Sequence, residues 1–157
     1  RREVAAEKFC TGPGQNVLQL GELLVEIKFP VRSANSGSHY RRFIPRNEMD
    51  IAVVGVGASV ELDDGKENIV SARVAMGAVA PTPLFVPQVG DAIAGQPANE
   101  DTLKKAGAAA RELVSPITDM RGTAEYRIHL TGVLTERVLQ AAISRARGEA
   151  VCTKIGH

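Results

Sequence analysis

The sequence is poor in aromatic residues, which make up 4% of its 157 residues, and it contains no tryptophan. A surface that binds single-stranded RNA by base stacking needs exposed aromatic rings, so this composition argues against such a protein. The net charge is only +1. A chain with so small an excess of cations has no general basic field with which to attract nucleic acid or an anionic membrane.

Cysteines and long apolar runs are also scarce. The only cysteines, Cys10 and Cys152, lie near opposite ends of the chain, and two cysteines do not form a disulfide framework. A single disulfide between them is the alternative to free thiols in a reducing cytoplasm, which we favour. The sequence has neither a run of about 18 apolar residues, which a membrane span needs, nor a visible signal peptide. We therefore expect a cytoplasmic protein.

Hydrophobic residues make up 44% of the chain and charged residues 24%, which is typical of a folded globular protein. The length suits one domain with a sizeable core, and we expect residues 1–157 to form that domain. The chain opens on Arg1 without a methionine. This start indicates a piece of a longer protein.

Four stretches in the first half have the pattern of β-strands. In Leu24–Phe29, apolar residues alternate with Glu26 and Lys28, which predicts a half-buried strand. The other three predicted strands are residues 39–46, Ile51–Leu62 and Ile69–Ala80. Asp63–Lys66 has the composition of a hairpin turn in which Gly65 supplies a positive φ angle.

The second half has the pattern of helices. We predict them over Leu84–Ala94, Glu100–Val114 and Ala124–Arg147. Asn99 and Thr123 stand where the last two helices need an N-terminal cap. Strands followed by helices indicate an α+β fold, with an antiparallel sheet of three to four strands and about three helices packed on one of its faces.

Charge gathers just before the most apolar strand. Tyr40 and Arg42 fall on one face of the predicted strand 39–46. Arg46, Glu48 and Asp50 follow and have three interpretations: a loop that gates a binding site, a solvated ion pair, or, for Asp50, a cap on the backbone where the loop joins the strand.

The other motifs are weaker indications of function. Gly55-Val56-Gly57 lacks the third glycine of a dinucleotide-binding loop and the surrounding βαβ unit, so close packing of a strand is favoured. The charged cluster at Asp119–Arg127 could form a site, but we favour capping of the last helix and contact with a neighbouring domain or subunit. The histidines and cysteines have no metal-ligand spacing, and there is no catalytic serine motif, so we expect neither a metal site nor a catalytic residue in this chain.

Several blocks, in order, resemble the C-terminal domain of the FAD-binding (medium) subunit of molybdenum hydroxylases, the carbon monoxide dehydrogenase and xanthine dehydrogenase family. The resemblance runs over roughly residues 9–147. The blocks are Phe9–Gly14, Gly21–Ile27, Tyr40–Phe43, Arg46, Asp50–Val56, Ala72–Pro83 and Asp119–Arg127. No single block is as specific as a metal-ligand signature, but their order and spacing together are specific.

The resemblance implies a cofactor and partners. In this family an N-terminal domain, absent from this chain, holds most of the FAD, and the C-terminal domain covers the isoalloxazine side. Partner subunits carry two [2Fe-2S] clusters and the molybdenum cofactor, and electrons pass from molybdenum through the clusters to FAD and on to an acceptor. We therefore expect a part of an oxidoreductase with no autonomous activity. The alternative is a non-catalytic interaction domain that assembles a complex without binding flavin.

The resemblance also implies site residues. The aromatic residue near the flavin falls on Tyr40, and the basic residue, usually lysine in the family, falls on Arg42. Arginine at this position keeps the positive charge but replaces the compact ammonium group of lysine with a planar guanidinium group. The mobile loop beside the ring falls on Arg46 to Asp50. A cation here has a physical purpose, because a reduced flavin carries negative charge at its pyrimidine end.

Overall fold

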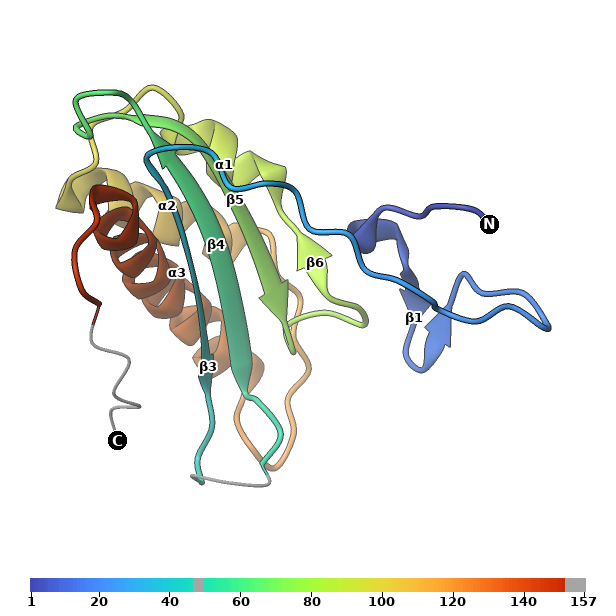
Figure 1. Cartoon of the computed structure of the whole chain (residues 1–157). Helices are drawn as coiled ribbons and strands as arrows, with labels where there is room; N and C mark the ends of the chain where they lie inside the picture. Colours follow the sequence, from blue (N-terminus) through green and yellow to red (C-terminus); the bar gives the residue numbers. More distant parts are fainter. Residues whose placement is uncertain (47–49, 152–157) are drawn as a thin grey trace.

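The structure, a computed structural model, describes residues 1–46 and 50–151. Its main sheet is a four-stranded antiparallel meander in which neighbours in space are neighbours in sequence (Figure 1). In sheet order the strands are β3 (Ser36–Phe43), β4 (Val54–Leu62), β5 (Ile69–Gly77) and β6 (Leu84–Phe85). This order suits an antiparallel sheet, since consecutive strands can pair without a long crossover connection.

Three helices cover one face of this sheet (Figure 1): α1 (Pro87–Ile93), α2 (Glu100–Glu112) and α3 (Ala124–Arg147). The two predicted caps are present: Asn99 accepts a hydrogen bond from the Thr102 amide at 3.0 Å, and Thr123 accepts one from the Tyr126 amide at 3.2 Å. The α+β prediction is therefore confirmed. Among the helices in the described ranges, none has the length and apolarity needed to cross a membrane.

The core lies between the helices and the sheet. Val54, Val56 and Val60 of β4 point into it from alternate positions and are buried, as are Val138 and Leu139 of α3. The other face of β4, which carries Gly55 and Gly57, lies on the side of the sheet away from the helices (Figure 1). That open face is where a functional surface has room.

Close packing of α3 on the edge strand depends on Gly37. A Cβ atom added there would lie 2.1 Å from the carbonyl oxygen of Ala142 and 2.5 Å from the amide nitrogen of Ala146. No side chain can occupy that space, so helix and strand backbones approach each other directly.

The prediction of a strand at Leu24–Phe29 is wrong. Residues 23–33 form no helix or strand and join the N-terminal segment to β3 as a plain connection (Figure 1). An extended stretch becomes a strand only when a second backbone satisfies its hydrogen bonds, and none of the described residues provides one.

Smaller differences concern boundaries and one turn. β3 covers Ser36–Phe43 and so begins and ends three residues before the predicted strand 39–46, and Leu84–Phe85 is a short strand instead of the first turn of a helix. In the hairpin after β4 the positive φ angle, 58°, belongs to Lys66 and not to Gly65. The predicted limits of α3, in contrast, agree with the structure.

The N-terminal segment lies to one side of the main sheet (Figure 1). It contains a 3-10 turn, η1 (Ala6–Lys8), and a small hairpin of β1 (Cys10–Gly12) and β2 (Gln15–Asn16). Cys10 is exposed, while Cys152 lies outside the described residues.

Candidate functional site

Four small residues form a floor on the open face of the sheet. Gly55 and Gly57 of β4 pair with Gly77 and Ala75 of β5, so these positions lie side by side. We call this group the small-residue floor. Because only glycine and alanine stand there, no long side chain rises from these four positions, and the β5 positions, Gly77 and Ala75, are partly or fully exposed.

Tyr40 and Arg42 border the floor on the β3 side. Tyr40 pairs with Gly57 and Arg42 with Gly55, so both side chains stand on the same face, as the alternation predicted, and that face is the open one. Arg42 is exposed, and Tyr40 is 62% exposed. An exposed cation therefore lies beside an accessible aromatic ring on the same face of the strand.

Tyr40 leans over the two glycines of β4. Its hydroxyl oxygen lies 2.9 Å from where a Cβ of Gly55 would be, and its Cδ2 lies 3.6 Å from the corresponding position at Gly57. The sequence analysis favoured close packing of the strand at these glycines, and the structure fills part of that space with the tyrosine ring. Larger residues at these positions would displace the ring.

Arg73 and Phe85 border the opposite side of the floor, and both were missed by the sequence analysis. The Arg73 guanidinium carbon lies 4.3 Å from the centre of the Phe85 ring, a cation–π contact. The alternation along β5 could have revealed Arg73, because buried Val74 precedes Met76 on the face turned to the helices.

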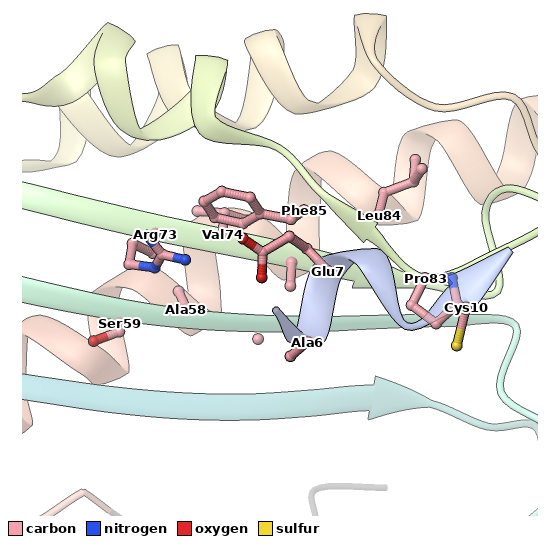
Figure 2. Close-up of a pocket in the computed structure, with 12 residues that line it drawn as sticks. Ala6, Glu7, Cys10, Ala58, Ser59, Arg73, Val74, Pro83, Leu84 and Phe85 are labelled. Carbon is pink, nitrogen blue, oxygen red and sulfur yellow. The ribbon is translucent and has the colours of Figure 1, made fainter. Parts of the chain in front are cut away.

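A pocket of about 420 Å³ opens beside this pair (Figure 2). Gly57 and Ala75 of the floor contribute to it, and Ala6, Glu7 and Cys10 of the N-terminal segment line its other side. The pocket and the floor thus form one continuous surface. Its lining is mostly apolar, which suits the body of a flat aromatic ligand.

Asp50 holds together the loop that follows β3. Its carboxylate accepts hydrogen bonds from the backbone amides of Arg46, at 3.0 Å, and Ile51, at 2.9 Å, and lies 3.6 Å from Nε of Arg46. Partial burial acts to raise the pKa of Asp50, but these bonds and the charge of Arg46 outweigh it and lower that pKa. The capping interpretation of Asp50 is confirmed, together with an ion pair; Glu48 lies outside the described residues.

Arg127 holds together three connecting segments, namely those that precede β4, follow β5 and precede α3. It is only 3% exposed. Its guanidinium donates to the carbonyl oxygens of Val53, at 2.7 Å, and Ala78, at 3.2 Å, and to the carboxylate of Asp119, at 2.7 Å. The hydrogen bond from Arg127 in turn lowers the pKa of Asp119.

The cluster at Asp119–Arg127 is therefore partly internal. Thr123 caps the helix as expected, but Arg127 is an anchor inside the chain and not a contact for another domain. The sequence gives no sign of this, because Arg127 reaches partners 49 and 74 positions away.

A comparison with family models matches residues 39–142 to the CO dehydrogenase flavoprotein C-terminal domain. Among curated proteins, the putative xanthine dehydrogenase FAD-binding subunit of Escherichia coli K12 is 32% identical over 94% of this chain and 50% of its own length. The carbon monoxide dehydrogenase medium chain of Afipia carboxidovorans is 32% identical over 93% of this chain and 50% of its own length.

Solved structures of related enzymes are also similar to this chain. A reconstituted CO dehydrogenase from Oligotropha carboxidovorans matches 92% of this chain and 49% of its own chain, with a TM-score of 0.84 and 32% identity. Quinoline 2-oxidoreductase from Pseudomonas putida 86 matches 92% of this chain and 49% of its own, with a TM-score of 0.82 and 28% identity. The chain spans about half the length of the curated relatives that it matches. It belongs to the CO dehydrogenase flavoprotein C-terminal domain family, whose members here are subunits of molybdenum hydroxylases.

Proposed function

We propose that this chain is the C-terminal part of an FAD-binding subunit and that its open sheet face covers the isoalloxazine ring of FAD. The observation that carries the proposal is the small-residue floor with Tyr40 and Arg42 beside it. A flat ring can approach the floor beside Tyr40, at Gly77 and Ala75, because a Cβ at Gly77 would meet nothing within 4 Å and Ala75 is exposed. The accessible ring of Tyr40 offers a stacking face and a hydroxyl group.

Each residue has a separate part in this proposal. FAD bound beside this face would supply the electron-transfer chemistry. Arg42 would provide positive charge near the pyrimidine end of the ring, where negative charge develops on reduction. The Arg46–Asp50 pair would hold the loop that follows β3 and so help to position Arg42. Arg73 and Phe85 would limit the ring on its far side.

The proposal also includes partner subunits. We expect an iron–sulfur subunit with [2Fe-2S] clusters and a large subunit with the molybdenum cofactor, since the relatives include medium chains of CO dehydrogenases. FAD itself would be held mainly by the part of the subunit that corresponds to the other half of the relatives. This chain would then orient the ring and shield it from water, without activity of its own.

The test uses a chimera in which the first half of the E. coli relative precedes this chain. Arg42→Met is expected to lower the flavin reduction potential by on the order of 30 mV or less, because Arg42 is solvent-exposed and its charge is screened. Arg41→Met is the matched control, since Arg41 stands on the opposite face of the same strand. A spectroelectrochemical titration measures both.

Two outcomes would contradict the proposal. A correctly folded chimera without a flavin absorbance spectrum would favour the alternative of a non-catalytic interaction domain. If the reduction potential of the flavin changed equally in the Arg41 and Arg42 variants, the open sheet face would not be part of the flavin site.

A further inference from the structure

One cross-strand row on the open face of the sheet has an aromatic residue at each end. Tyr40 of β3 pairs with Gly57 of β4. Gly57 pairs in turn with Ala75 of β5, and Ala75 pairs with Phe85 of β6. Because directly opposite residues of an antiparallel pair share a face, Phe85 stands on the open face together with Tyr40. We call these four residues the aromatic-ended row.

The row has room for a flat ring between its two aromatic ends. Neighbouring strands lie about 4.8 Å apart, so the backbones at Tyr40 and Phe85 are separated by three such spacings, about 14 Å. Tyr40 leans over Gly57, which leaves Ala75 as the open position of the row. Ala75 is exposed, and it lines the pocket of about 420 Å³ together with Phe85. A ring above Ala75 would have Tyr40 on one side and Phe85 on the other.

Arg73 restrains the ring of Phe85. It lies two residues before Ala75 on β5 and therefore on the same face. Its guanidinium carbon is 4.3 Å from the centre of the Phe85 ring, and both side chains line the pocket (Figure 2). β6 has only two residues, so few backbone hydrogen bonds hold Phe85 in place. The guanidinium covers one face of the ring and leaves the other face and the edge for a ligand.

Arg73 is not engaged elsewhere in the part of the chain that the structure describes. It forms no ion pair there, so no carboxylate competes with Phe85 for its side chain. Glu7 lines the same pocket but lies too far from Arg73 to pair with it. The contact with Phe85 is therefore what determines where the guanidinium lies.

We propose that Phe85 is the second aromatic wall of the flavin site and that Arg73 is a positioning residue that acts through it. This inference rests on the proposed function, since it takes the isoalloxazine ring as the ligand. The ring would lie above Ala75, where contact between aromatic rings adds to the gain from burying apolar surface. Arg73 would not touch FAD but would hold Phe85 against it.

The affinity of the flavin-free chimera for FAD, measured by fluorescence titration, tests this proposal. Phe85→Leu keeps an apolar side chain but removes the ring, and should weaken binding by about three- to tenfold. Arg73→Met removes the cation over that ring, and should weaken binding by about two- to fivefold. Arg137→Met is the matched control, because Arg137 is exposed on α3, which packs on the opposite face of the sheet.

Two further variants separate positioning from direct contact. If Arg73 acts only through Phe85, adding Arg73→Met to Phe85→Leu should weaken binding no further. Arg73→Lys keeps a cation that can lie over the ring, and should restore most of the affinity. Visible circular dichroism of the bound flavin reports the surroundings of its ring. It should change most in Phe85→Leu, less in Arg73→Met and least in Arg73→Lys.

Additive losses in the double variant would make Arg73 a direct ligand and would overturn the inference. Equal affinities of the Arg73→Met and Arg137→Met chimeras would also overturn it. Should Phe85→Leu lower the melting temperature of the flavin-free chimera, the comparison of Arg73→Met with Arg73→Lys decides, because Arg73 is exposed.

Failure of this inference can be told from failure of the proposed function. If Phe85→Leu and Arg73→Met leave binding unchanged while Arg42→Met still shifts the flavin potential more than Arg41→Met does, the proposed function stands and this inference fails. If the folded chimera binds no flavin, both fail.

Discussion

Arg127 shows how much one residue can organise. Arg127→Ala would leave the carbonyl oxygens of Val53 and Ala78 without their donor and would open space in the interior. We expect the free energy of unfolding to fall by about 3 kcal/mol, because each lost bond involves a charged donor and a poorly hydrated partner. Urea denaturation at pH 7 measures this. A loss no larger than that of an exposed arginine, such as Arg137→Ala, would contradict it.

The same variant should change the response to acid. The hydrogen bond from Arg127 and a bond from the Arg121 amide lower the pKa of Asp119 below its ordinary value of 3.8. The stabilisation is therefore present above pH 3.8 and is lost as the pH falls through the lower pKa of the folded state. Between pH 5 and pH 2, Arg127→Ala should lose less stability than the parent chain in the same assay.

At the scale of the elements, α3 and β3 depend on direct backbone contact at Gly37. Gly37→Ala should lower the free energy of unfolding by about 1–3 kcal/mol, because a Cβ would overlap the backbone of Ala142 and Ala146 and the helix would have to move. Thermal unfolding followed by circular dichroism measures the change.

Gly77→Ala is the matched control for that measurement. A Cβ at Gly77 meets nothing within 4 Å. Stability should therefore stay within about 0.5 kcal/mol of the parent chain. If the two variants were equally stable, the close approach of α3 to β3 would not be a determinant of the fold.

The elements also show what could be predicted from sequence. The limits of α3 were correct, because the Thr123 cap and the residues that end the helix are local in the chain. The faces of Tyr40 and Arg42 followed from simple alternation. Leu24–Phe29 failed, because its alternation describes a strand whose partner does not occur among the described residues. The buried role of Arg127 was hidden for a similar reason, since its partners are distant in sequence.

At the scale of the whole molecule, we propose that the chain presents one side of the flavin site. The floor and its bordering residues offer a face for a ring and an exposed cation, Arg42, while we propose that the other half of the subunit holds most of the FAD. We expect this 157-residue chain to bind FAD weakly or not at all. Titration followed by flavin fluorescence measures the affinity. Binding as tight as that of the chimera would contradict the division of the site between two halves.

The meander order of β3, β4, β5 and β6 has a consequence for when the sheet folds relative to assembly. Every strand pairs with the next one along the chain, so no strand has to wait for a distant one before it can pair. Proteins with such local contacts fold faster than those that must first join distant segments. We therefore expect the open face to fold before another polypeptide binds to it. Assembly would then begin from a folded surface and would not be limited by the folding of this sheet.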